Sequence, residues 1–300
     1  MPTRFLRITT GNLLLFTLYM IANCSSAKPL RDTVKSALNV LGLGAATRDI
    51  RNRSKYLFDA EARHRNARFK EHSAPDGLPM PPPKLIYLVT GQFDAETFYH
   101  NGVIGAGCIR DILNRHGLDM NAFGKILDFG CGCGRVIRQW RTLTGPRLYG
   151  TDYNPRLIDW CRRNLSFADF DVNKAGTPLS FADGTFDFIY SISVFTHLTE
   201  SSQRFWMDEI MRVLKPGGHL LFTVHGVSRL NGLSPEQRQA FEAGSLVIVG
   251  SQYSGTNSCG TYHPQQYVRN VLCRDWRLLA FEPGGAKDAN QDAFLMQKLL

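Results

Sequence analysis

A glycine-rich run that follows an apolar segment is the part of this sequence best suited to hold a ligand. Residues 125–135 read Lys-Ile-Leu-Asp-Phe-Gly-Cys-Gly-Cys-Gly-Arg, which places Gly130, Gly132 and Gly134 at alternate positions. Glycine has no side chain to keep a ligand away from the backbone. The N–H groups of such a turn, followed by a helix that starts near Gly134, can donate to a negative group, and we expect a carboxylate there.

Two aspartates accompany the glycines. Asp128 stands two residues before the first glycine, and Asp152 ends a second apolar run, 24 residues after Asp128. That separation is typical of a carboxylate that accepts both hydroxyls of a ribose. A dinucleotide site of the G-x-G-x-x-G type would need glycine at position 135, where this chain has Arg135. The pattern therefore favours a nucleoside site of another kind.

Alternating strand and helix patterns must position these residues. Such alternation indicates a parallel, doubly wound α/β sheet. We expect strands at 125–129, 147–151, 169–173, 186–192 and 219–225, and helices at 94–116, 134–143, 155–165 and 200–214.

Taken together, these motifs give a specific resemblance. The run from Asp128 to Gly134 and Asp152, with residues 181–187, 193–198 and 212–218, resembles the class I S-adenosylmethionine (AdoMet) dependent methyltransferases over about 125–225. The resemblance implies methyltransferase activity, AdoMet as cofactor and a Rossmann-like, mostly parallel sheet of seven strands. It also implies two final strands, at about 276–282 and 291–298, the last inserted antiparallel between its neighbours.

The resemblance also assigns roles to residues that bind the cofactor. The loop would receive the methionine part, Asp152 the ribose and Tyr153 one face of the adenine, while Asp128 would orient the loop. Asn173, at the end of the third strand, is the candidate for the adenine edge, where related families often have an acid. The loop residues in this set are Gly130, Cys131, Gly132 and Gly134.

His197 is the candidate catalytic base, because imidazole titrates near neutral pH and this residue follows the fourth strand. A base is needed only if the acceptor holds its proton. The alternative, a histidine with a purely structural role, stays open. His225, at the end of the fifth strand, is the second choice.

The composition indicates one α/β domain with an extension. The chain has 300 residues, and its net charge of +9 is uneven: residues 1–80 hold 13 Lys and Arg against 6 Asp and Glu. A proline-rich connector at 77–83 suggests an N-terminal basic helical extension at 1–80 and a catalytic domain at 81–300, with an insertion at about 232–263. The extension would contain helices at 29–43 and 47–71.

The first 27 residues and the cysteines bear on location. Residues 1–27 are hydrophobic and imitate a secretory signal. The seven cysteines form no C-x-x-C pair, so neither a disulfide framework nor a zinc site is indicated. We therefore expect a cytoplasmic protein without a metal, whose residues 1–70 could make peripheral contact with a membrane.

Two other functions compete with a methyltransferase that acts on a small or carrier-linked acceptor, with a hydroxyl as one candidate group. A nicotinamide-dependent oxidoreductase also uses a glycine turn and a ribose acid, but Arg135 counts against it. An inactive methyltransferase-like module could be recruited through the basic helix. Nucleic acid is not the favoured partner, because aromatic residues are sparse in that helix. The sequence names no acceptor.

Overall fold

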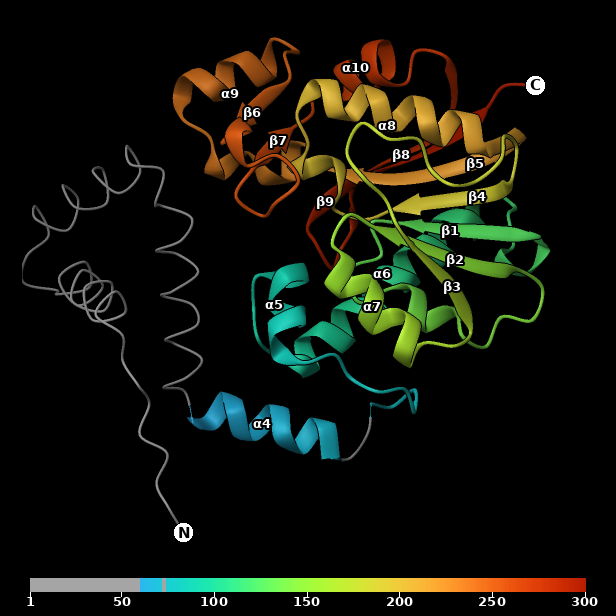
Figure 1. The fold of residues 1–300 in the computed structure, drawn as a ribbon. Helices are drawn as coiled ribbons and strands as arrows, with labels where there is room; N and C mark the ends of the chain where they lie inside the picture. The colour runs from blue at the N-terminus through green and yellow to red at the C-terminus, as the bar shows by residue number, and fades with distance from the viewer. Residues whose placement is uncertain (1–59, 72–73) are drawn as a thin grey trace, which may run out of the picture. The chain divides into compact units, whose positions relative to one another are not determined.

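The computed structural model describes residues 60–71 and 74–300 (Figure 1). The compact unit that carries the sheet runs from Asn66 to Leu300. The hydrophobic segment at 1–27 and the helix expected at 29–43 lie outside the described residues. Of the basic helix expected at 47–71, the structure describes α4 (Ala60–Glu71). Within the described ranges, no helix is both long enough and apolar enough to cross a membrane.

A seven-stranded sheet forms the centre of the unit, in the order β3-β2-β1-β4-β5-β9-β8. The first five strands are parallel, as the alternating pattern predicts. Strand β9 pairs antiparallel with both β5 and β8, as the resemblance implies. The strands are β1 (Lys125–Phe129), β2 (Arg147–Asp152), β3 (Ala168–Val172), β4 (Phe186–Ser191), β5 (Leu214–Val224), β8 (Trp276–Ala286) and β9 (Gln291–Lys298).

Helices cover both faces of the sheet (Figure 1). Successive side chains of a strand point to opposite faces, and β1 shows this: Ile126 belongs to the core that includes α5, α6 and α7, while Leu127 and Phe129 belong to the core under α8. The helices are α5 (Pro83–Thr90), α6 (Ala95–Arg115), α7 (Pro155–Asn164), α8 (Glu200–Val213), α9 (Pro235–Glu242) and α10 (Gln265–Tyr267).

The prediction of a helix at 134–143 is wrong. In its place the structure has a short 3-10 helix, η2 (Ile137–Trp140). Tertiary contacts of two of its side chains explain the difference. The fully buried Arg138 guanidinium bonds to Asp76, with Nε 2.6 Å from Oδ2, and Trp140 Nε1 donates to the Tyr190 hydroxyl at 3.1 Å. Local helix propensity yields to a buried ion pair and a buried hydrogen bond.

Segment 74–80 falls within the expected extension (1–80) and packs on the sheet unit. Ala74 and Met80 are buried in the core on the α6 face. Asp76 contributes the buried carboxylate that pairs with Arg138, whose Nη2 also donates to the Leu78 carbonyl at 3.1 Å. These residues are therefore part of the same packed unit as the sheet.

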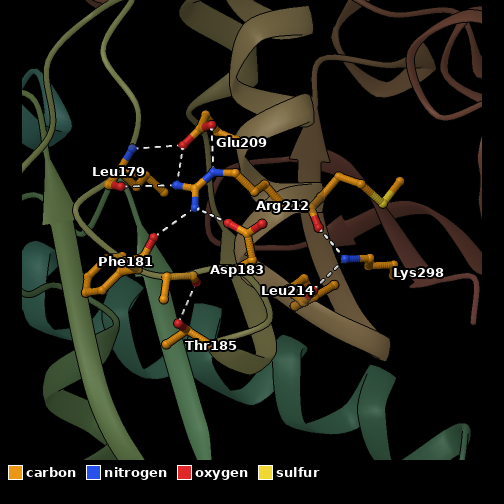
Figure 2. Close-up of polar contacts among 10 residues, drawn as sticks. Leu179, Phe181, Asp183, Thr185, Glu209, Arg212, Leu214 and Lys298 are labelled. Atoms are coloured by element: carbon orange, nitrogen blue, oxygen red, sulfur yellow. Dashed lines mark hydrogen bonds and ion pairs between the residues drawn. The ribbon is translucent and has the colours of Figure 1, made fainter.

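Arg212 organises the loop that enters β4 (Figure 2). Its guanidinium donates to Glu209 at 2.8 and 3.0 Å, to Asp183 at 2.7 Å, and to the carbonyls of Phe181 at 2.9 Å and Leu179 at 3.1 Å. The hydrogen bonds to Glu209 and Asp183 raise the pKa of Arg212, so it stays charged. This cluster lies at the amino end of β4, the edge of the sheet opposite the glycine loop.

Replacing Arg212 with methionine should lower the free energy of unfolding by about 2 to 3 kcal/mol, because it leaves the mostly buried Glu209 carboxylate without its cation. The affinity of the glycine loop for a ligand should not change, since the cluster lies at the other edge of the sheet. Chemical denaturation and titration calorimetry would measure both. Arg204→Met, which breaks an exposed pair with Glu200 on the same helix, is the control and should change stability little. Equal losses of stability in the two variants would contradict the role given to Arg212 as the cation that stabilises Glu209.

Candidate active site

The glycine loop lies at the carboxyl end of β1 and has contacts that only glycine permits. Gly130 and Gly132 have φ angles of +85° and +57°, in the left-handed region. A Cβ on Gly130 would clash with Val194, which follows β4, and a Cβ on Gly132 would lie 2.7 Å from Val89 Cγ2 in α5. The loop is therefore enclosed between α5 and the segment after β4, and its shape depends on glycine.

Three amides of the loop already have acceptors in the protein. Gly130 and Cys131 both donate to the Thr151 carbonyl, at 2.8 and 2.9 Å, and Gly132 donates to Asp152 Oδ2 at 3.0 Å. The expectation that these amides are free for a ligand carboxylate is therefore not met, because the end of β2 takes them. What the loop offers a ligand is close approach and a fixed shape.

Asp152 holds the loop and keeps capacity for a ligand. Its carboxylate is buried and accepts two amide hydrogens, from Gly132 on Oδ2 and from Asn154 on Oδ1 at 2.8 Å. Burial raises the pKa of Asp152 to about 6, against the two amide bonds, which lower it. A carboxylate has about four lone-pair sites, so roughly two remain. Two vicinal hydroxyls of a ribose match that number.

Asn173 supplies an independent test of the fit. It follows β3, and its backbone N–H donates to the Asp152 backbone carbonyl at 3.1 Å, so the two residues are neighbours. Its side-chain oxygen is buried and has no hydrogen-bond partner among the described residues. That oxygen is an acceptor, and the amino group of adenine is a donor. Tyr153, 54% exposed, lies next to Asp152. The residues present thus fit the nucleoside part of AdoMet.

Asp128 is buried beside Tyr190 of the core on the α6 face. Its carboxylate accepts from the Tyr190 hydroxyl at 2.9 Å, and that hydroxyl accepts from Trp140 Nε1 at 3.1 Å. Burial raises the pKa of Asp128 to about 7, although the Tyr190 hydrogen bond opposes the shift. A role for Asp128 in orienting the loop, through β1, stays a prediction.

His197 ends a short 3-10 helix, η3 (Phe195–His197), directly after β4. Its Nδ1 lies 2.7 Å from the carbonyl oxygen of Cys259. Because a carbonyl only accepts, Nδ1 must carry the proton, and Nε2 keeps its lone pair. Burial lowers the pKa of His197, with the Cys259 hydrogen bond opposing it, so the ring is neutral at pH 7. This is the protonation state that a general base requires.

His225 lies beside His197, with ring centroids 6.1 Å apart and the rings nearly perpendicular. Burial lowers the pKa of His225 to about 3. Its Nδ1 is buried without a partner among the described residues. A ring that stays neutral over the whole working range is less suited to take up a proton than His197. The ranking of His197 above His225 stays a prediction.

The insertion after β5 closes one side of the site. It has its own two-stranded sheet, β6 (Val247–Val249) with β7 (Gly260–Tyr262), and a small core with α9. Three contacts fix it beside the site: Gly255 N donates to the His197 carbonyl at 2.7 Å, Thr261 Oγ1 to the Leu198 carbonyl at 2.7 Å, and Asn257 Nδ2 to the Leu88 carbonyl of α5 at 3.3 Å.

Sequence reasoning missed the groups that enclose the site. The Cys259 carbonyl orients His197, yet a backbone oxygen has no signal in residue type. Val89 and Val194 cover the glycines, but they read only as ordinary apolar residues. In the part of the chain that the structure describes, no three potential metal ligands come together in a way that could hold an ion.

Comparison with known proteins agrees with this geometry. Residues 127–222 match the family model described as a methyltransferase domain. A sterol 24-C-methyltransferase of Schizosaccharomyces pombe is 35% identical over 99 residues, which are 31% of this chain and 26% of the relative. The malonyl-[acyl-carrier protein] O-methyltransferase of Enterobacter lignolyticus is 32% identical over 126 residues, 42% of this chain and 47% of the relative. The chain thus spans about a quarter to a half of the length of these curated relatives.

A solved methyltransferase structure from Methanosarcina mazei is also similar, with a TM-score of 0.47 and 22% identity, over 62% of this chain and 97% of that one. The motif residues, the strand order and the matched segment place residues 127–222 of this chain in the class I S-adenosylmethionine-dependent methyltransferase family, whose cofactor is S-adenosyl-L-methionine.

Proposed function

We propose that this protein transfers a methyl group from AdoMet to a small or carrier-linked acceptor, at a hydroxyl oxygen. The observation that carries the proposal is the pairing of Asp152, a buried carboxylate with unused lone pairs, with the unpartnered oxygen of Asn173 beside it. AdoMet supplies a methyl group on a positively charged sulfur, open to in-line displacement. The residues of this chain have to hold the nucleoside, align the acceptor and exclude water.

His197 is the proposed base. Its Nε2 is free to accept a proton, because the Cys259 carbonyl holds the proton on Nδ1. A hydroxyl must lose its proton as it attacks, so a base in this state accelerates the step. A carboxylate acceptor is already ionised at neutral pH and would not need His197. The fixed tautomer therefore favours a hydroxyl.

The names of the relatives suggest the chemical class of the acceptor. They include a malonyl-[acyl-carrier protein] O-methyltransferase and a fatty-acid O-methyltransferase of Mycolicibacterium smegmatis, which is 33% identical over 101 residues. Both names describe acyl chains, one of them bound to a carrier. We infer a lipid-like or carrier-linked acceptor for this chain too.

The proposal places the protein in the cytoplasm, where the cofactor is made and where free cysteines persist. The six described cysteines are all free. Contact of residues 1–70 with a membrane surface is the further part of this proposal, since that region carries most of the excess positive charge. Fractionation of cells that produce the full chain would test both statements.

Parallel thermal unfolding with AdoMet, S-adenosylhomocysteine and NAD tests the cofactor. A ligand that binds only the folded state raises the melting temperature, by an amount that follows about RT ln(1 + [L]/Kd). The two sulfur nucleosides should stabilise the protein and NAD should not. Transfer of labelled methyl from AdoMet to hydroxylated and plain fatty acids, free and carrier-linked, then identifies the acceptor. Stabilisation by NAD alone would overturn the proposal.

A further inference from the structure

Gln291, the first residue of β9, closes a ring of hydrogen bonds at the carboxyl edge of the sheet. Ser193 N donates to Thr223 Oγ1 at 2.8 Å, the Thr223 hydroxyl donates to Gln291 Oε1 at 2.6 Å, and Gln291 Nε2 donates to Ser193 Oγ at 2.8 Å. The three side chains come from the turn after β4, from β5 and from β9. Thr223 and Gln291 are both buried.

Ser193 has an unusual backbone. Its φ is +62°, and Asn290 is the other non-glycine residue with a positive φ among the described residues. The left-handed region costs a serine energy, and such a conformation persists only where the surroundings hold it. The ring forms two hydrogen bonds with Ser193, one at its backbone amide and one at its hydroxyl, and so stabilises this conformation. Chains of hydrogen bonds in a buried site also polarise and strengthen one another.

The turn at Ser193 directs two neighbours into the site. Val194 comes next and packs against Gly130, so closely that a Cβ on the glycine would clash with it. The short helix η3 follows and ends at His197. A change of φ at Ser193 would move both the cover of the cofactor loop and the imidazole.

Strand pairing does not need the Gln291 side chain. The register of β9 with β5 runs from Asp292 to Gln297, and that with β8 runs on to Lys298, through backbone groups. Next to Gln291, Asp292 anchors a different segment: its Oδ2 accepts from Val227 N at 3.1 Å and its Oδ1 from Gly284 N at 2.9 Å. The Gln291 amide is thus directed to the turn at Ser193.

We propose that Gln291 is a positioning residue for methyl transfer: through Thr223 and Ser193 it fixes the segment that covers the cofactor loop and carries His197. The role assigned to His197 rests on the proposed function. The link from Gln291 to the orientation of the His197 imidazole does not. Gln291 is buried, and its side chain acts on Ser193 from a strand that lies 98 residues later in the sequence.

The test compares Gln291→Leu with Gln297→Leu in the full chain. Gln297 lies on the same strand and donates to the Gly217 carbonyl at 3.2 Å, at the opposite edge of the sheet. Calorimetry with S-adenosylhomocysteine and NMR of the His197 ring nitrogens are the two readouts. Gln291→Leu should lower the affinity for S-adenosylhomocysteine about tenfold, which is the usual effect of leaving one buried hydrogen-bonding group unpaired. It should also convert the single Nδ1–H tautomer of His197 into a mixture. Gln297→Leu should do neither.

A folded Gln291→Leu variant whose affinity and His197 signals both match the unaltered protein would overturn the inference. If that variant does not fold, Thr223→Val is tested by the same two readouts. Valine keeps the shape of the threonine side chain but lacks the hydroxyl that takes part in the ring of hydrogen bonds. If the unaltered protein binds no S-adenosylhomocysteine, the proposed function fails. The His197 signals alone then decide whether Gln291 positions that segment.

Discussion

Replacing Asp152 with alanine should weaken AdoMet binding by about a hundredfold. The carboxylate is the proposed partner of the ribose hydroxyls, and each charge-assisted hydrogen bond is worth about 1.5 to 3 kcal/mol, with tenfold in affinity for every 1.4 kcal/mol. The substitution also removes the acceptor of the Gly132 amide, so the glycine loop loses one of its three hydrogen bonds to β2. Titration calorimetry with AdoMet would measure the loss.

Asp169→Ala is the matched control for that experiment. Asp169 lies in β3, the strand next to β2, but its side chain is 55% exposed and pairs with Arg147. Its loss should leave AdoMet affinity unchanged. Equal affinities of Asp152→Ala and the unaltered protein would remove the ribose role from Asp152.

The raised pKa of Asp152 predicts opposite effects of pH on stability and on affinity. Burial lifts this pKa from its ordinary 3.8 to about 6, so the folded protein holds the proton more tightly than the unfolded chain. This group therefore favours the folded state fully below its ordinary pKa, and that contribution is lost as the pH rises through about 6. AdoMet affinity should rise over the same interval, because the ionised form accepts hydroxyl hydrogens. Calorimetry between those pH values would detect the change.

Replacing His197 with alanine should lower the turnover number for a hydroxyl acceptor by about 10²- to 10³-fold, the usual contribution of a general base. Affinity for S-adenosylhomocysteine should stay the same, because the imidazole is proposed to act on the acceptor. Initial rates with labelled AdoMet and the best acceptor would measure the change. His116→Ala, at the exposed residue that follows α6, is the control and should keep full activity.

The pH profile separates a base from a structural histidine. Burial lowers the pKa of His197 below its ordinary 6.5, so Nε2 stays unprotonated into mildly acidic solution. The rate should therefore hold as the pH falls through 6.5 and decline only below that value. If His197→Ala keeps the rate and the profile of the unaltered protein, the residue is structural and the acceptor needs no base.

Much of the sheet follows from local sequence. The segments that form β1, β2 and β4 are short, contain several apolar or aromatic residues and lie next to polar or turn residues, so the strands are predicted to within one residue at each end before any packing is known. The same holds for α7, where Asn154 caps the first turn and Pro155 begins it. Even the insertion of β9 between β5 and β8 follows from resemblance, because the motifs before it identify the order.

The segment 134–143 marks where local sequence fails. Its residues can form a helix, yet Arg138 and Trp140 find partners at Asp76 and Tyr190 that are 62 and 50 residues away. Buried polar groups left without partners cost more than a turn of helix gains. Periodicity in a window of ten residues contains no information about such partners.

The sequence by itself determined the residues that can receive a nucleoside: glycines where no side chain fits, and a carboxylate at the end of the next strand. Only the tertiary structure decided how they are used. The end of β2 takes up three of the loop amides, a carbonyl 62 residues beyond His197 sets its tautomer, and Gln291 holds the turn at Ser193. The physical reason is that residue type fixes what a group can donate or accept, whereas its partner depends on which distant segment folding brings within hydrogen-bond distance.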